Sequence, residues 1–140
     1  MDTANKHTVG GISGLMLLKC LSIKGLDIIS GCELYGRKSY IELLCIYNEE
    51  TPTMLGKLKA LVNTALTGKD LKEYTILIHG LKGSCYNVCA NALGKYAETL
   101  EKAARGEDKQ FITANTECFI ETVGILLEKL NYVFGVNSHA

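Results

Sequence analysis

The chain contains no tryptophan, three phenylalanines and one proline among its 140 residues. Its core is therefore expected to be mostly aliphatic, and Pro52 is the single position where proline would remove a backbone donor from a helix. Net charge is also absent, because fifteen basic residues balance fifteen acidic ones. The overall charge thus gives no reason to expect a nucleic-acid partner.

Long hydrophobic runs are missing as well. The longest apolar stretch, over residues 15–23, is interrupted by Lys19 and is far shorter than the roughly 20 residues that span a bilayer. No basic leader with a small-residue cleavage site marks a secretory signal. We therefore expect a cytoplasmic protein that neither crosses nor binds a membrane.

Metal-binding spacings are lacking too. No Cys-x-x-Cys pair occurs among the six cysteines, and the three histidines are widely separated. We therefore expect no metal site and no cofactor held by the chain itself. The cysteines are expected to be reduced and to pack as small buried hydrophobic side chains; they are Cys20, Cys32, Cys45, Cys85, Cys89 and Cys118.

The apolar residues that are present recur at helical spacing and predict an all-α protein without strands. We expect one helical domain over residues 13–135. Flexible segments are expected over residues 1–12 and 136–140, so His7 and His139 in those segments carry no predicted role.

Short helices are predicted at the start of the domain. The first is expected over residues 15–23, and Asp27 is placed to N-cap a second that ends near Gly36. Further on, Thr51 and Pro52 allow two interpretations: an interruption of one helix, or the N-cap and first residue of a new one. The inward-facing residues predicted around this point are Tyr40, Leu44, Tyr47, Leu55, Leu58, Val62 and Ala65.

Three more helices are predicted in the C-terminal half. The first opens at Lys69-Asp70, Asn91 caps the next, which Gly106 closes, and Asp108 caps the last. Short connections predict antiparallel neighbours in a four-helix bundle. The predicted inward stripe of the first of these helices is Leu71, Tyr74, Ile78, Leu81, Cys85 and Val88, and that of the last is Ile112, Phe119, Val123, Leu126, Leu130 and Val133.

One turn of this pattern places reactive groups together. His79 lies off the apolar stripe and is predicted to be exposed, while Lys82 and Gly83 follow at i+3 and i+4 on the same face. Glycine inside a helix costs on the order of 1 kcal/mol relative to alanine, and Gly80 adds a second such cost. Two glycines beside one histidine therefore indicate that a partner must approach closely.

The residue types fit phosphoryl transfer. A neutral imidazole offers one ring nitrogen with a free lone pair, and its unperturbed pKa near ~6.5 keeps that form abundant at neutral pH. Catalysis of phosphoryl transfer is mostly positioning and electrostatic stabilisation. We therefore predict that His79 accepts the phosphoryl group, Lys82 stabilises its charge, and Gly83 and Gly80 give a partner access.

A wider set of residues resembles the histidine-containing phosphotransfer (Hpt) domain, over about residues 22–130. The set comprises His79-Gly80-Leu81-Lys82-Gly83-Ser84, Ala90, Leu93, Leu100-Glu101, Ala103-Ala104 and Gly106-Glu107-Asp108, with Gly25-Leu26-Asp27-Ile28, Gly31 and Tyr40-Ile41-Glu42-Leu43-Leu44 upstream. Two positions depart from the family pattern: Gly80 replaces a small hydroxyl residue, and Cys89 replaces a glycine. The resemblance favours one long helix over about residues 38–67, kinked near residues 48–52, and Gly68 is suited to end it.

The resemblance implies a phosphorelay intermediate of two-component signal transduction. His79 would carry a phosphoryl group between the aspartates of receiver domains, and a sensor histidine kinase is a further possible partner. The chain has no glycine-rich nucleotide loop, so we expect no autokinase activity, and any Mg²⁺ should belong to the receiver. We expect a monomer.

Two other functions are open at this point. A helical adaptor of the same fold would bind receivers or kinases without carrying phosphate, but it would need neither His79 nor Lys82. An unrelated bundle could hold a cofactor between facing helices. The other two histidines lie near the ends of the chain and are poorly placed to bind a cofactor at such a site.

Overall fold

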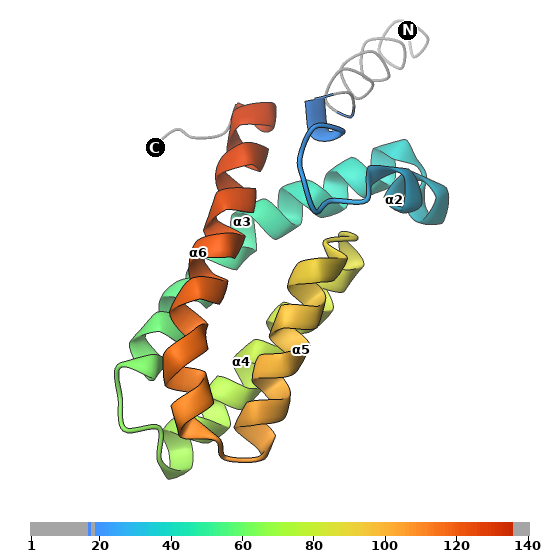
Figure 1. Ribbon diagram of the computed structural model, residues 1–140. Helices are drawn as coiled ribbons and strands as arrows, with labels where there is room; N and C mark the ends of the chain where they lie inside the picture. The colour runs from blue at the N-terminus through green and yellow to red at the C-terminus, as the bar shows by residue number, and fades with distance from the viewer. Residues whose placement is uncertain (1–16, 18, 136–140) are drawn as a thin grey trace, which may run out of the picture.

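The computed structural model describes residue 17 and residues 19–135. The helices labelled in Figure 1 are α2 (Ile28–Tyr35), α3 (Arg37–Val62), α4 (Gly68–Asn87), α5 (Asn91–Arg105) and α6 (Lys109–Phe134). Within these residues there is no strand, which confirms the all-α class.

The ends of the chain are only partly described. The segments predicted to be flexible, 1–12 and 136–140, lie outside the described residues, and so do residues 15, 16 and 18 of the first predicted helix. The described part of that helix ends at Cys20, and turns follow it, whereas the sequence pattern predicts a helix as far as Ile23.

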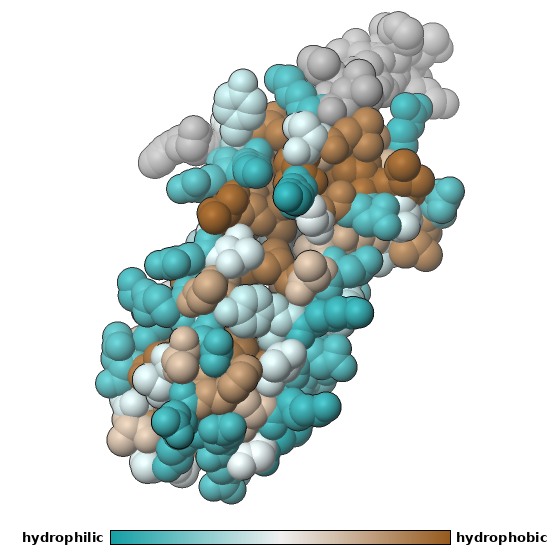
Figure 2. All heavy atoms as spheres, in the orientation of Figure 1, coloured by the Kyte–Doolittle hydropathy of each residue, from teal (hydrophilic) through white to brown (hydrophobic). Residues whose placement is uncertain are grey.

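Four long helices surround one core. Helix α4 packs against α3 and α5, and α6 packs against the same two helices, while the short α2 packs on α3. Figure 1 shows α4 and α5 side by side and α6 crossing α3. Figure 2 shows hydrophobic surface gathered around α2 and the segment before it, whereas the other end of this face is mostly hydrophilic.

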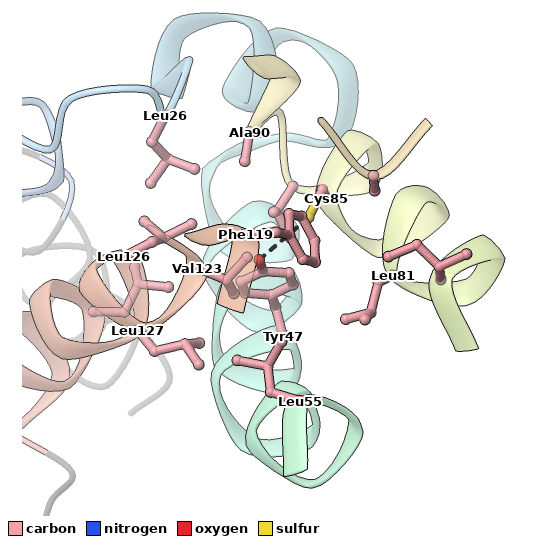
Figure 3. Packing of buried hydrophobic residues seen from close by; sticks show 14 of the residues in the cluster. Leu26, Tyr47, Leu55, Leu81, Cys85, Ala90, Phe119, Val123, Leu126 and Leu127 are labelled. Atoms are coloured by element: carbon pink, nitrogen blue, oxygen red, sulfur yellow. Dashed lines mark hydrogen bonds between the residues drawn. The ribbon is translucent and has the colours of Figure 1, made fainter. Parts of the chain in front are cut away.

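The predicted inward stripes of α4 and α6 are confirmed, because every residue in them is buried. Figure 3 shows where the stripes meet: Tyr47 of α3 lies beside Phe119 and Val123 of α6, and its hydroxyl is 3.5 Å from the Cys85 sulfur of α4. Burial raises the pKa of this thiol. The inward stripe of α4 thus fixes which face of this helix remains for solvent.

Helix α3 runs unbroken through Pro52 and curves as it passes behind α6 (Figure 1). It ends at Val62, five residues before the predicted end. The chain turns there because the Thr64 side chain forms hydrogen bonds with backbone groups on both sides of it. The Thr64 hydroxyl donates to the Leu61 carbonyl and accepts from the Leu66 amide. Leu66 then takes a φ of 54° and is buried in the core.

The predictions made for two residues at this junction are therefore wrong. Gly68 does not end α3 but is the first residue of α4, one position before the predicted start. Ala65 lies beyond the helix and is exposed, and Leu66 takes its place in the core.

The N-caps predicted from aspartate are confirmed. The Asp27 carboxylate accepts from the Ser30 amide at the start of α2, and Asp108 accepts from the Phe111 amide at the start of α6. The N-cap predicted for α5 is wrong by one residue, because Ala90 holds that position and Asn91 is the first helical residue.

The cysteines differ in burial. All six are free, and Cys20, Cys85 and Cys89 are buried as expected. Cys32 and Cys45 are only half-buried, and Cys118 is exposed, so the prediction of uniform burial is wrong for these three. Cys118 lies on α6 between the inward-facing positions of that helix and cannot reach the core from there.

Candidate functional site

Helix α4 presents His79 to solvent, as its position off the apolar stripe predicts. The imidazole side chain is 61% exposed, while Ile78 and Leu81 on either side are fully buried. A Cβ atom at Gly83 would meet no atom within 4 Å, so this glycine borders open space. Gly80 differs, because a Cβ there would lie 3.3 Å from the end of the Met54 side chain on α3.

The packing of α5 on α4 brings a buried glutamate to the histidine. Glu101 is 5% exposed, and its Oε2 lies 2.9 Å from Nδ1 of His79. Its Oε1 lies 2.8 Å from Nζ of Lys82. Arg105, one turn further along α5, donates to Oε2 from Nε at 3.0 Å and from its terminal guanidinium nitrogen. One carboxylate thus binds three side chains.

These contacts keep the carboxylate ionised. Burial acts to raise the pKa of Glu101, but hydrogen bonds from Lys82, Arg105 and His79 outweigh it and lower this pKa to about 2. An ionised carboxylate can only accept hydrogen bonds, so Nδ1 of His79 must be the donor. The neutral imidazole therefore carries its proton on Nδ1 and leaves the lone pair on Nε2.

An open hollow adjoins the imidazole. Its volume is about 460 Å³, and it is lined by Lys72, Thr75, Ile76, His79 and Arg105. Two cations, Lys72 and Arg105, therefore lie beside the exposed ring. A hollow with this charge can attract a dianionic group to the histidine.

Comparison with known proteins fits this geometry. The sequence model described as the Hpt domain matches residues 42–131, which is more than half of the chain and includes α4 and α5 whole. The chain belongs to the Hpt domain family. No curated protein and no solved structure shows a significant match to it.

Hpt domains are phosphotransfer modules of two-component signalling rather than classical enzymes, and membership implies interaction with receiver or kinase proteins. The helical bundle is the expected scaffold for such a module. In this Hpt domain one bundle face brings together His79, Lys82 and Gly83, the residues singled out by the sequence. Gly80 lies on the same helix but borders α3.

The sequence pattern did not identify Glu101 and Arg105 as site residues. Glu101 contributed to the family resemblance, but its burial and its contacts were not anticipated. A signal was present, because Glu101 lies four residues after the inward-facing Ala97 and four before Arg105. A glutamate in an inward register is almost never fully buried unless it is paired.

The described residues contain neither a metal-binding cluster nor a membrane-spanning helix. No group of three or more histidine, cysteine, aspartate or glutamate side chains in this part of the chain is arranged to hold a metal ion. Over the same residues, no helix has the length and apolar character needed to span a membrane.

Proposed function

We propose that this Hpt domain shuttles a phosphoryl group between receiver aspartates through Nε2 of His79. The observation that carries the proposal is the hydrogen bond between Nδ1 and the ionised Glu101, because it leaves the nucleophilic lone pair on the other nitrogen of an exposed ring. In each transfer Nε2 attacks phosphorus while the bond from phosphorus to the aspartate oxygen breaks. The reverse reaction returns the group to a second receiver.

The neighbouring residues have distinct roles in this proposal. Lys82 stabilises the charge of the phosphoryl group, and its 28% exposed side chain already balances Glu101 beside the ring. Gly83 leaves room for the receiver, since open space surrounds its Cα. Gly80 gives access less directly: its missing side chain lets Met54 of α3 pack against the histidine turn.

The remaining parts of the reaction come from partners. The domain does not phosphorylate itself from ATP, and the Mg²⁺ used in transfer belongs to the receiver. Receivers are the partners, with a sensor kinase as a further one, and the domain acts as a cytoplasmic monomer. In this proposal α3–α6 act as an antiparallel four-helix bundle, with short N-terminal helices beside it, that keeps the imidazole in one exposed position. The packing of α4 and of α6 against both α3 and α5 supports this arrangement.

The test is phosphate acceptance from a phosphorylated receiver. The wild-type chain should gain a label that is labile in acid and stable in base, as expected for phosphohistidine. His79→Gln should gain none, yet keep its helical circular dichroism, because an exposed side chain contributes little to stability. Full labelling of the variant would exclude His79 as the acceptor.

The same experiment addresses the adaptor alternative. An adaptor would bind the receiver without ever becoming labelled, and its binding would not depend on phosphate. Receiver binding by the wild-type chain with no label under any condition would favour that function over transfer.

A further inference from the structure

We propose that Glu101 keeps the phosphorylated imidazole of His79 protonated at Nδ1, so that the phosphoryl group enters and leaves without any proton transfer. This inference rests on the proposed function, in which His79 carries phosphate. It assigns Glu101 as a positioning residue that acts through the ring, not as a group that touches phosphorus.

The geometry fixes one partner for the Nδ1 proton. Glu101 Oε2 lies 2.9 Å from Nδ1, within hydrogen-bond distance, and the carboxylate is anchored from the other side by Lys82 and Arg105. Since Glu101 is buried, water cannot readily replace the imidazole as its partner. The carboxylate is therefore held in place while the exposed edge of the ring reacts.

The bonds and charges of the transfer balance around this contact. When the Nε2 lone pair forms the bond to phosphorus, the donor's bond to phosphorus breaks and its electron pair stays with the donor oxygen. The ring keeps its Nδ1 proton and becomes a cation that faces the Glu101 anion. On return, an aspartate oxygen of the receiver forms a bond to phosphorus, the electron pair of the N–P bond goes back to Nε2, and the neutral Nδ1–H imidazole is restored.

Loss of the Nδ1 proton would oppose transfer in two ways. The deprotonated ring would direct a lone pair at the carboxylate, which is repulsive at 2.9 Å. Cleavage of the N–P bond would then release an imidazolide anion, a much poorer leaving group than neutral imidazole. Keeping the proton thus makes phospho-His79 a reactive donor.

The other charged groups at the site have opposite effects on the stability of the protonated ring. From α4, Lys82 binds Glu101 and Lys72 lines the hollow beside the ring, while Arg105 does both from α5. These cations disfavour a positively charged ring. The phosphoryl group that creates that positive charge brings negative charges of its own, which offset the cations at the moment when the ring needs its proton.

The wild-type protein provides the first measurement. The domain is phosphorylated with phosphoramidate, and the ³¹P and ring ¹⁵N chemical shifts of phospho-His79 are followed from about pH 6 to pH 9, the range in which an unperturbed imidazole loses its proton. We expect shifts that stay those of the protonated ring across the range. A full titration near neutral pH would overturn the inference.

Glu101→Gln provides the second measurement, since its amide oxygen can still accept from Nδ1 but carries no charge. The rate of transfer from the phosphorylated variant to a receiver is divided by the wild-type rate at each pH. This ratio should fall by about tenfold per pH unit above the midpoint at which phospho-His79 of the variant loses its ring proton, because only the protonated fraction reacts. Glu73→Gln makes the same change at an exposed position of α4 and should keep a ratio near one. A ratio independent of pH in Glu101→Gln would refute the inference.

The outcomes separate this inference from the function on which it rests. If phosphoramidate and phosphorylated receivers never label wild-type His79, the proposed function fails. If His79 is labelled but its ring titrates freely, the function stands and the role of Glu101 is rejected. Should Glu101→Gln fail to fold, the wild-type titration still decides.

Discussion

At the scale of single residues, Gly83 and His79 lie one turn apart on α4, and a side chain at Gly83 would enter open space. Helical side chains lean toward the N-terminus, so such a group would extend over the histidine. Gly83→Arg should therefore slow transfer from a receiver by roughly a hundredfold, as expected when a reacting group is misplaced by an ångström or more. Labelling by small phosphoramidate should change much less.

A matched control lies on another helix. Gly56 of α3 is an exposed helical glycine, and a Cβ atom added to it, like one added to Gly83, would meet no atom within 4 Å. Gly56→Arg should leave receiver transfer unchanged. Transfer at the wild-type rate in Gly83→Arg would show that this glycine does not make room for a partner.

How far single residues could be predicted depends on whether their environment is local. His79, Lys82 and Gly83 share one helical turn, so spacing alone was enough to place them together. Glu101 joins them from α5, 22 positions along the chain from His79, and only the packing of two helices makes that contact. Helical periodicity identifies an inward position but does not identify the partner that it meets.

At the scale of secondary-structure elements, α4 and α5 are each followed by a left-handed residue that is not glycine. Cys89 after α4 has a φ of 66°, and Glu107 after α5 has a φ of 57°. At α4 the Ala90 amide bonds to the Cys85 carbonyl and the Cys89 amide to the Tyr86 carbonyl, which is the Schellman pattern. The family's glycine is thus replaced by a cysteine that keeps the glycine conformation.

The end of α5 repeats this pattern. The Asp108 amide bonds to the Ala103 carbonyl and the Glu107 amide to the Ala104 carbonyl. Gly106, which the sequence had indicated as the closing residue, is the C-cap with an ordinary negative φ, and the left-handed residue is the next one. Helix starts were predicted correctly at aspartates because a cap is a local side-chain bond. These ends instead use a left-handed conformation at Cys89 and Glu107, residue types that rarely adopt it and so give no signal in the sequence.

Glu107 therefore holds strain that glycine would relieve. A left-handed conformation costs a residue with a Cβ atom roughly 1–2 kcal/mol. Glu107→Gly should raise the free energy of unfolding by about 1 kcal/mol, measured by urea denaturation. Glu107→Ala removes the same charge but keeps the Cβ atom, so it should gain clearly less. Equal gains in both variants would assign the effect to charge.

At the scale of the whole molecule, the Glu101 contacts link the long helices α4 and α5 across the face that carries the site. The all-α class and the inward stripes of α4 and α6 were predictable, because both follow from one period repeated over many residues. The end of α3 at Val62 was not, because it depends on the Thr64 turn and on the burial of Leu66. The buried ionic link between α4 and α5 was likewise outside the reach of periodicity.

That link predicts how stability depends on pH. The pKa of Glu101 falls from 4.5 to about 2 on folding, so folding favours the ionised form. The resulting stabilisation is fully present above the unfolded-state pKa and is lost as the pH falls through the folded-state pKa. For this buried group the stabilisation is on the order of 3 kcal/mol.

Urea denaturation of the wild-type chain and Glu101→Gln should therefore give a constant difference in unfolding free energy from about pH 7 to pH 5. That difference should shrink toward about pH 3, because Gln has no proton to gain. A difference that stays unchanged over this whole range would mean that the Glu101 carboxylate is not held ionised by the fold, and the assignment of the Nδ1 proton on His79 would lose its basis.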